Sequence, residues 1–490
     1  MTIAFDPRDP DFIADPFPVL IDLMEHEPVF WSEKLRGWVL TRYDHVRASL
    51  RDPRLSADRV RPFLAHFKGP ERPTVEHLVE HLSMWASFNE PPVHTRLRGL
   101  MNKAMTLQSI LAMEPRVRAL ADELIDDVID RGEMDMIDDF AYPLSATVIA
   151  EMFGVPRADV PLLKKWSDEL GAFIVQSRTL ANKYAVADGG LRSMTAYFED
   201  IVAERRRRPR EDMLSRLIAA EEKGDSLSPE ELLACCALLF FAGHETTTHL
   251  IGNGMIALLR HPEALAELKE RRFDTTLMAS AVEEMLRWDG PLLMMARVAS
   301  EDFDLEDKRI LAGSRVFLMI AAANRDPRVF PDPDRFDIHR RDNRNIAFGN
   351  GIHHCIGAPL GRLEARVAFP RLLERLIDPK LATSKLIWRD AFVVRGVNQL
   401  PMRFARPATA FAPESVRWLG PASARLGPPP STRIGPPPSS RLGPPPSTRI
   451  GPPPSSRLGP PPSTRIGPPP SSRLGPPPSS RMESPPSSRM

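Results

Sequence analysis

The sequence predicts a mainly α-helical fold with a minor β part, followed by a tail that cannot bury a core. Three observations support this prediction. Apolar side chains recur at helical spacing in several long stretches. Short runs of alternating apolar and polar residues gather near residue 300. From Arg425 an eight-residue unit, Arg-(Leu/Ile)-Gly-Pro-Pro-Pro-Ser-(Ser/Thr), recurs to the end of the chain. We therefore expect a single domain over 1–405 and a disordered Pro/Arg-rich tail over 406–490, with its repeats from 425.

Apolar periodicity predicts the helices of the first domain. The clearest start is Ser228-Pro229-Glu230-Glu231, which joins a Ser cap, a Pro at the first helical position and a Glu three residues after the cap. The helix that it opens is apolar on nearly every face from 232 to 241, so it should cross the interior and end at His261-Pro262. The other predicted helices span Glu114–Asp130, Asp212–Glu222, Thr276–Trp288 and Leu360–Leu376.

Alternating residues predict the minor β part. The expected strands span Ala296–Ala299, Phe303–Leu305, Arg309–Ile310 and Arg315–Ile320, and a last alternation runs from Phe392 to Phe404. The domain should end near Ala405, directly after this alternation.

The composition limits the classes of protein to consider. The chain has 490 residues, of which 42% are hydrophobic and 26% charged, and its net charge is +1. These values are typical of a globular protein, and they indicate neither a nucleic-acid partner nor a membrane partner. Two of its three cysteines, Cys235 and Cys236, are adjacent, so a disulfide framework is not expected. With no apolar leader over 1–18, we expect a cytoplasmic location, and we expect a monomer.

Arginine is concentrated in two places. The run 205–208 is most simply a solvated helix end or loop. Residues 425–490 hold nine arginines and one acid, Glu483. The simple reading of this tail is an expanded repeat without function. The alternative is a semi-rigid spacer, or a ligand for a proline-binding or acidic partner.

The most informative segment is Phe348-Gly349-Asn350-Gly351-Ile352-His353-His354-Cys355-Ile356-Gly357. Its glycines permit a tight turn, and a helix should begin just after Cys355. A thiolate there would lie near free backbone N–H groups and the positive end of the helix dipole, which favour a metal-binding thiolate. Taken alone, Cys355 could be an inert buried side chain, or part of a zinc site with the two histidines.

The whole segment resembles the haem-binding loop of the cytochrome P450 family. The matching positions are Phe348, Gly349, Gly351, His353, Cys355 and Gly357. The resemblance extends over nearly all of residues 1–405 and implies the P450 fold, with haem b as the cofactor. It implies that Cys355 is the axial ligand of the haem iron and that Phe348, Gly349 and Gly357 belong to the cofactor-binding loop.

Further motifs follow in the family's order. His94 and Arg98 lie four apart on one helix face, which alone could be a solvated basic face. The resemblance makes them, with Arg297 and His353, the contacts of the haem propionates. Glu90 stands where the family often has Asp, a departure that should not affect haem binding.

A structural triad is also implied. Glu284 and Arg287 match the family's Glu-x-x-Arg, and three residues apart on a helix they can pair. Pro333-Asp334-Arg335-Phe336 resembles the later Pro-x-Arg-Phe motif, so Arg335 is expected to complete a buried triad that holds the segment before the cysteine loop.

The middle of the long helix carries Ala242-Gly243-His244-Glu245-Thr246. The Thr246 hydroxyl could simply bond the carbonyl four residues back. The resemblance implies instead that Thr246 and Glu245 are catalytic and deliver the protons that dioxygen activation needs.

The implied activity is insertion of an oxygen atom from O2 into a small apolar organic substrate of fatty acid, terpenoid, steroid or polyketide type. By family analogy, Leu239, Ala242, Leu293, Met294 and Val397 are the pocket candidates. The chain has no flavin, nicotinamide or iron–sulfur motif, so electrons should come from a separate ferredoxin or flavodoxin with its reductase. A docking patch could be formed by Arg344, Arg362 and Arg366, although a solvated face fits them equally well.

Two alternatives use the same fold. A peroxygenase would consume hydrogen peroxide directly, but that variant tends to replace the acid–alcohol pair, which this chain keeps. A haem sensor without enzymatic activity would not need the dioxygen-activating helix. A third alternative makes the tail the functional part and the domain a scaffold.

Overall fold

The structure is a computed structural model that describes residues 3–174, 180, 182–221 and 227–406. The predicted tail therefore lies outside the described residues, except for Arg406. Most of its residues lie in helices, as predicted.

The helices are α1 Pro10–Ala14, α2 Phe17–His26, α3 Tyr43–Ser49, α4 Val60–His66, α5 Arg72–Leu82, α6 Val93–Ala104, α7 Leu107–Leu111, α8 Glu114–Ile129, α9 Tyr142–Phe153, α10 Val160–Ile174, α11 Lys183–Arg207, α12 Met213–Glu221, α13 Pro229–Arg260, α14 Pro262–Glu270, α15 Thr275–Asp289, α16 Ile320–Ala323 and α17 Ala358–Arg375. Short turns of other helix types are η1 Ala86–Phe88, η2 Met136–Ala141, η3 Arg157–Asp159 and η4 Gly351–His353. The strands are β1 Val29–Ser32, β2 Gly37–Leu40, β3 Leu55–Ser56, β4 Glu133–Asp135, β5 Met295–Ala299, β6 Phe303–Leu305, β7 Lys308–Ile310, β8 Arg315–Leu318, β9 Ile377–Leu381 and β10 Pro401–Ala405.

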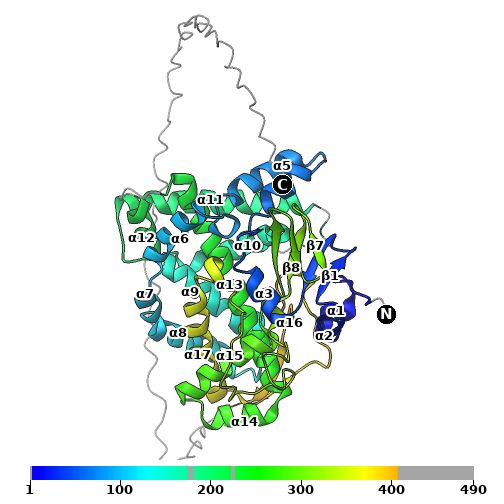
Figure 1. The fold of residues 1–490 in the computed structure, drawn as a ribbon. Coiled ribbons are helices and arrows are strands. Elements are labelled where there is room, and N and C mark those ends of the chain that lie inside the picture. The colour runs from blue at the N-terminus through cyan, green and yellow to red at the C-terminus, as the bar shows by residue number, and fades with distance from the viewer. Residues whose placement is uncertain (1–2, 175–179, 181, 222–226, 407–490) are drawn as a thin grey trace, which may run out of the picture. The chain divides into compact units, whose positions relative to one another are not determined.

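The strands form three small sheets. The largest has the order β1-β2-β8-β5-β3, in which β2 and β8 are parallel and the other neighbours antiparallel. A second sheet, β4-β10-β9, joins the end of the described chain to its middle, and β6 pairs with β7. Figure 1 shows β1, β7 and β8 beside α1 and α2, with α6, α8 and α9 on the opposite side.

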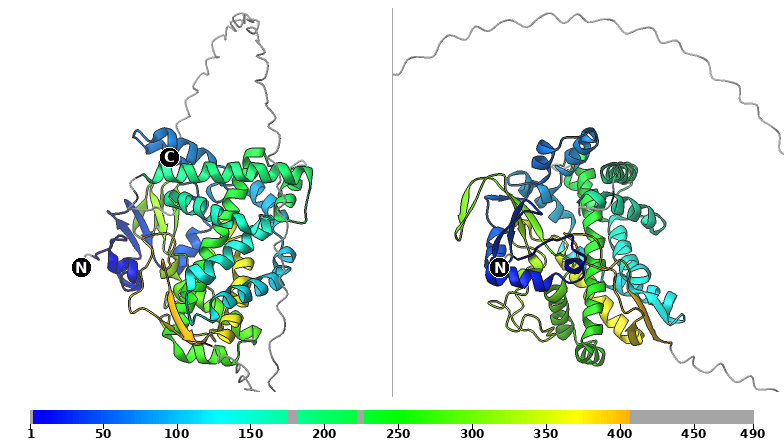
Figure 2. Two further views of the ribbon diagram at one scale, coloured as in Figure 1. Left: turned by 180° about the vertical axis from the view of Figure 1, so that it is seen from behind. Right: turned by 90° about the vertical axis from the view of Figure 1, so that its right-hand side faces the viewer.

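Helix α13 is the central element of the helical part. It begins at the predicted capping box, in which Ser228 and Glu231 each bond the other's backbone amide, and it ends at Arg260. Figure 2 shows this long green helix running through the middle of the surrounding helices. Glycines let neighbours approach it closely: a Cβ at Gly243 would lie 2.8 Å from Ile149 of α9, and one at Gly254 would lie 2.7 Å from Phe369 of α17.

The other predicted helices and the predicted strands are confirmed, with ends displaced by at most two residues. Two stretches of the predicted β part are shorter than their sequence patterns. The strand expected to reach Ile320 ends at Leu318, because α16 begins at Ile320. The alternation from Phe392 to Phe404 is regular strand only over β10, and its earlier part makes isolated bridges, such as Leu292 with Val394. Across the described residues, no helix has the length and apolarity that a bilayer crossing requires.

Candidate active site

The cysteine loop has the backbone that its glycines predict. Gly349 and Gly351 adopt positive φ angles of 73° and 75°, which other residues rarely adopt. A Cβ at Gly351 would also lie 2.9 Å from the Leu50 carbonyl oxygen. The turn closes when the Cys355 amide donates to the Phe348 carbonyl over 2.9 Å, and α17 begins at Ala358 as predicted. Glycine is therefore required at Gly351 both for conformation and for space.

The Cys355 side chain lies at the first turn of α17. Burial raises the pKa of the Cys355 thiol, and the backbone amides of Gly357 and Ala358, together with the Arg98 guanidinium, act in the opposite direction. Two hydrogen-bond donors and a nearby positive charge would stabilise the thiolate form of the sulfur, which is the form that binds a metal ion. A Cβ at Gly357 would lie 3.8 Å from the sulfur, an ordinary van der Waals contact.

Basic side chains gather beside this loop. Arg98 of α6 donates to the His354 carbonyl over 2.6 Å, and the rings of His94 and His353 lie 4.4 Å apart between centroids. His94 is buried, and its Nδ1 has no hydrogen-bond partner among the described residues. Burial is the main cause that lowers the pKa of His94 to about 4. A buried ring nitrogen without a partner fits a site that receives a polar group of a cofactor.

Arg59 is a second cation near Arg297, and no sequence motif indicated it. Arg297 of β5 is buried, and burial lowers its pKa to about 10. Burial likewise lowers the pKa of Arg59 to about 10, and the charge of Arg297 adds to this effect. Arg59 also stacks on the Phe88 ring, with its guanidinium carbon 4.8 Å from the ring centroid. A buried guanidinium whose charge is disfavoured by burial and by a second guanidinium would be stabilised by a nearby anion.

Glu90 links this cluster to the large sheet. Its carboxylate accepts from the Ala57 amide over 2.5 Å and lies 3.7 Å from His353 Nε2. Burial raises the pKa of Glu90, but the His353 ring and the Ala57 amide outweigh burial, so the pKa is lowered overall. The glutamate thus lies beside His353, whose Nε2 is buried and has no hydrogen-bond partner among the described residues.

The middle of α13 is unusually accessible for an interior helix. Ala242 is exposed and Gly243, Glu245 and Thr246 are half-buried, whereas the helix is buried on both sides of this stretch. The Thr246 hydroxyl lies 3.4 Å from the Ala242 carbonyl, the back-bonding contact that the simpler reading predicts. The Glu245 carboxylate pairs with Arg389 over 2.8 Å. The predicted acid and alcohol therefore lie together on the accessible side of the helix.

The triad prediction is correct for Glu284 and Arg287 and wrong for Arg335. Glu284 and Arg287 are buried and joined by two bonds of 2.8 Å. The third cation is Arg340, whose Nε lies 3.1 Å from Glu284 Oε2. Arg335 is exposed, and its carbonyl accepts from Arg287 and Arg340. The chain turns at 337–340, so the arginine that returns to α15 stands five residues after Arg335.

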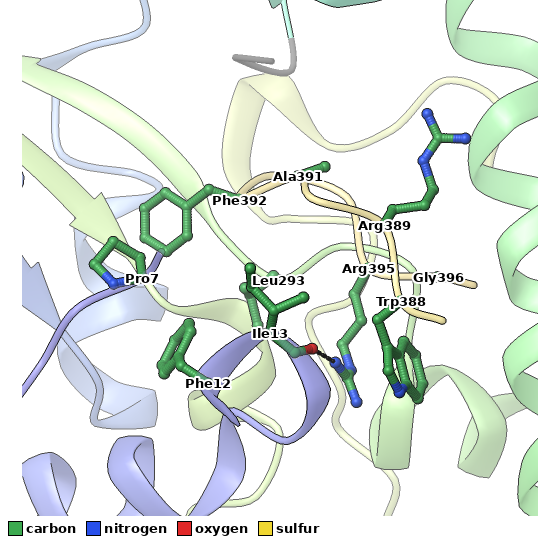
Figure 3. A pocket seen from close by; sticks show the side chains of 10 residues that line it. All are labelled: Pro7, Phe12, Ile13, Leu293, Trp388, Arg389, Ala391, Phe392, Arg395 and Gly396. Carbon is green, nitrogen blue, oxygen red and sulfur yellow. Dashed lines mark hydrogen bonds between the residues drawn. The ribbon is translucent and has the colours of Figure 1, made fainter. Parts of the chain in front are cut away.

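The pocket candidates fall into two groups. Leu239 and Ala242 lie on α13 near Thr246, and Leu239 and Val397 belong to the main apolar core. Leu293 and Met294 instead belong to a separate cluster with Phe5, Phe12, Phe17 and Phe392. Figure 3 shows Leu293 beside Phe12 and Phe392 at a small cavity. The structure therefore does not bring Leu293 and Met294 together with the α13 candidates.

The docking-patch arginines are partly engaged within the chain. Arg362 pairs with Glu283 over 2.5 Å, and Arg344 pairs with Asp342 over 2.7 Å. Arg366 is exposed and donates to the Arg362 carbonyl over 3.1 Å. Among the three, Arg366 alone is not part of an ion pair within the described residues.

Fold and site together define a haem-thiolate protein: a cysteine at a helix start, buried cations beside it, and an acid–alcohol pair on the central helix. The chain belongs to the cytochrome P450 family. Residues 63–377 match the sequence model of the family described as Cytochrome P450. It is a cytochrome P450 monooxygenase, and haem b is the cofactor of this family.

Individual relatives match almost their whole length. The biotin biosynthesis cytochrome P450 of Bacillus subtilis (strain 168) is 37% identical over 409 residues, which cover 82% of this chain and 100% of the relative. The monooxygenase PikC of Streptomyces venezuelae is 39% identical over 405 residues, which cover 81% of this chain and 92% of PikC. The crystal structure of P450BioI in complex with hexadec-9Z-enoic acid ligated acyl carrier protein has a TM-score of 0.74 at 35% identity. That match covers 81% of this chain and 99% of P450BioI.

Proposed function

We propose that this chain inserts one oxygen atom from O2 into a small apolar organic substrate, with electrons from separate redox proteins. The observation that carries the proposal is the cysteine loop, in which the backbone amides of Gly357 and Ala358 and the charge of Arg98 favour the anionic form of the Cys355 sulfur. Thiolate ligation by such a sulfur is what distinguishes oxygen activation from oxygen storage. When bound, haem b supplies the redox chemistry that cleaves dioxygen.

The residues of the cation cluster would hold the cofactor. Cys355 would bind the iron, and Phe348, Gly349 and Gly357 would shape the loop around it. His94, Arg98, Arg297 and His353 would bind the two propionates, and we add Arg59 to this set because it lies near Arg297. Guanidinium groups suit carboxylates because their paired N–H donors match the two oxygens.

Thr246 and Glu245 would supply protons. Hydroxylation of a substrate RH consumes O2, two electrons and two protons and yields ROH and water, so both protons must reach an apolar interior. Thr246 lies on the accessible stretch of α13, and Glu245 is one residue away with solvent access through Arg389. A peroxide-driven enzyme would not need this pair, because hydrogen peroxide brings both protons itself.

An apolar substrate is favoured by the α13 surface. Leu239, Ala242 and Val397 carry no polar group, and Ala242 is the exposed member. The relative P450BioI has a crystal structure with a fatty acyl chain on its carrier protein, which supports a substrate of this chemistry. Ferredoxin or flavodoxin would be the electron donor, with Arg366 as the available cation of the docking patch. A monomer and a cytoplasmic location remain predictions.

Carbon monoxide binding tests the central claim. We expect the reconstituted, reduced protein to give the carbon monoxide spectrum of thiolate-ligated haem, and Cys355→Ser to abolish that spectrum. Cys235→Ser is the matched control, since Cys235 is a buried thiol of α13 distant from the loop, and it should keep the wild-type spectrum. A wild-type spectrum typical of histidine-ligated haem would refute the assignment of Cys355 as the iron ligand.

The added role of Arg59 is tested by cofactor retention. Removing one charge-assisted hydrogen bond costs about 1.5–3 kcal/mol. Arg59→Gln should therefore speed haem transfer to apomyoglobin by roughly 10- to 100-fold, because 1.4 kcal/mol corresponds to a factor of ten. Arg61→Gln removes a nearby exposed arginine that pairs with Asp58 and serves as the control. Equal transfer rates for both variants would exclude Arg59 from the propionate site.

A further inference from the structure

Glu245 is held by an arginine from a distant segment. The segment 386–397, between β9 and β10, places Arg389 Nη2 2.8 Å from Glu245 Oε1. The carboxylate is nearly buried, with a side-chain exposure of 15%, whereas Arg389 is 32% exposed. One end of the ion pair is therefore inside the helical part and the other reaches solvent.

The segment that carries Arg389 is itself firmly held. Trp388 forms a bridge with Val397, and the Arg389 amide donates to the Gly396 carbonyl over 2.9 Å. Arg395 pairs with Asp289 over 2.7 Å and donates to the Ile13 carbonyl over 3.0 Å. Figure 3 shows the two arginines of this segment pointing in opposite directions, Arg395 toward Ile13 and Arg389 away from it. Arg389 thus extends toward α13 from a fixed base.

A buried histidine lies behind the ion pair. His249 stands one turn after Glu245 on α13, is 1% exposed, and has no hydrogen-bond partner for either ring nitrogen among the described residues. Its ring lies so close to Gly396 that a Cβ there would be 2.1 Å from Nδ1. Burial, with the positive charge of Arg389 as a further cause, lowers the pKa of His249 to about 3. A neutral His249 leaves Arg389 as the cation that contacts Glu245.

The other ionisable groups near Glu245 do not replace Arg389. His244 is buried, and its Nδ1 lies 2.9 Å from the Phe240 carbonyl. Burial lowers the pKa of His244, while Glu245 and Asp168 oppose this and Lys164 adds to it. Lys164 and Asp168 of α10 pair with each other over 2.7 Å.

We propose that Arg389 is a positioning residue that holds the Glu245 carboxylate at the boundary between solvent and the Thr246 turn of α13. The inference rests on the proposed function of Glu245 in proton delivery. A carboxylate that relays protons must meet solvent and must also keep a defined direction toward the next acceptor. The Arg389 ion pair meets both requirements: its guanidinium is in contact with water, and its base on the 386–397 segment is fixed.

The test separates positioning from simple stability. Turnover is measured with a surrogate ferredoxin, its reductase and NADPH, with myristate as the probe, and oxygen consumption and released peroxide are recorded for Arg389→Gln, Arg389→Lys, Glu245→Gln and the double variant. We expect Arg389→Gln to slow oxygen consumption about tenfold, to raise the share of oxygen released as peroxide and to enlarge the solvent deuterium isotope effect. Arg389→Lys should restore most of the rate. Arg403→Gln, at a 73% exposed arginine of β10, is the control and should match the wild type.

The double variant gives the decisive comparison. If Arg389 acts through Glu245, the double variant should be no slower than Glu245→Gln alone, because the two changes affect one step. With hydrogen peroxide as the oxidant, Arg389→Gln should keep the wild-type rate, because peroxide brings both protons. A wild-type-like Arg389→Gln, multiplied effects in the double variant, or an equal loss with peroxide would each overturn the proposal. Absence of the thiolate carbon monoxide spectrum in the wild type would instead refute the proposed function.

Discussion

At the scale of single residues, Glu364 is a buried polar group whose desolvation is largely uncompensated. It is a buried carboxyl group of α17, and neither of its oxygens has a hydrogen-bond partner among the described residues. Burial raises its pKa to about 8 from an ordinary value of 4.5, and the nearby Ser145 opposes this only weakly. The folded protein therefore keeps this proton in a pH range where the unfolded chain loses it.

This shift has a definite sign in stability. Between the unfolded pKa of 4.5 and the folded pKa of about 8, the native state binds more protons, so its free energy of unfolding falls as the pH rises. Glu364→Gln removes the titration, and the variant should gain stability relative to the wild type across this window, by a few kcal/mol at its upper end. Chemical denaturation at several pH values measures the difference. Glu301→Gln, at an exposed residue, should show no such trend, and a pH-independent difference for Glu364→Gln would contradict the assignment.

At the scale of elements, the triad fixes the long irregular segment between α16 and the cysteine loop. Glu284 of α15 accepts from Arg287, from Arg340 and from the Asp337 amide, the last over 2.8 Å. Arg340 also donates to the Pro331 carbonyl over 2.7 Å. The Glu284 carboxylate of α15 thus holds the segment around Asp337 and Arg340 against this helix.

The correction from Arg335 to Arg340 makes a paired prediction. Arg340→Ala leaves the Glu284 charge buried with one cation fewer, so it should destabilise the fold by about 3–5 kcal/mol. Arg335→Ala removes an exposed side chain and should change stability by less than about 0.5 kcal/mol. Thermal unfolding of the two variants compares them directly. If Arg335→Ala were instead the more destabilising variant, Arg335 would be the third member of the triad, as the motif predicts.

How much the sequence could predict depends on the distance over which a residue acts. The ends of α13 and the turn around Cys355 follow from caps and glycines that act within a few residues, and these predictions were confirmed. Arg340, Arg59 and Arg389 act on partners from other segments, so no local pattern marks them. Arg205 shows the same limit: in a run predicted to be solvated, it is 1% exposed and bonds Asp212 over 2.6 Å. Whether a charged side chain is buried depends on the segment that packs against it, and the local sequence does not show that segment.

At the scale of the whole molecule, the described fold is closed before the repeats begin. Strand β10 pairs with both β4 and β9 and ends at Ala405. This pairing involves no residue after 406. The domain should therefore be self-sufficient.

Truncation tests this independence. A chain that stops at 424 should keep the haem content, the carbon monoxide spectrum and the turnover of the full chain. A chain that stops at 400 loses β10, exposes the edges of β4 and β9, and should fail to accumulate as folded protein. Lower turnover of the 424 truncation with intact haem would assign a function to the tail.

The bonds from Arg395 to the carbonyls of Ile13 and Ala14 join positions 382 and 381 residues apart. A ribosome adds roughly 5–20 residues per second, so about 20–80 seconds pass between the synthesis of those carbonyls and that of their donor. During this time water must satisfy them. The segment around Ile13 and Ala14 therefore cannot form these bonds until nearly the whole domain has been synthesised.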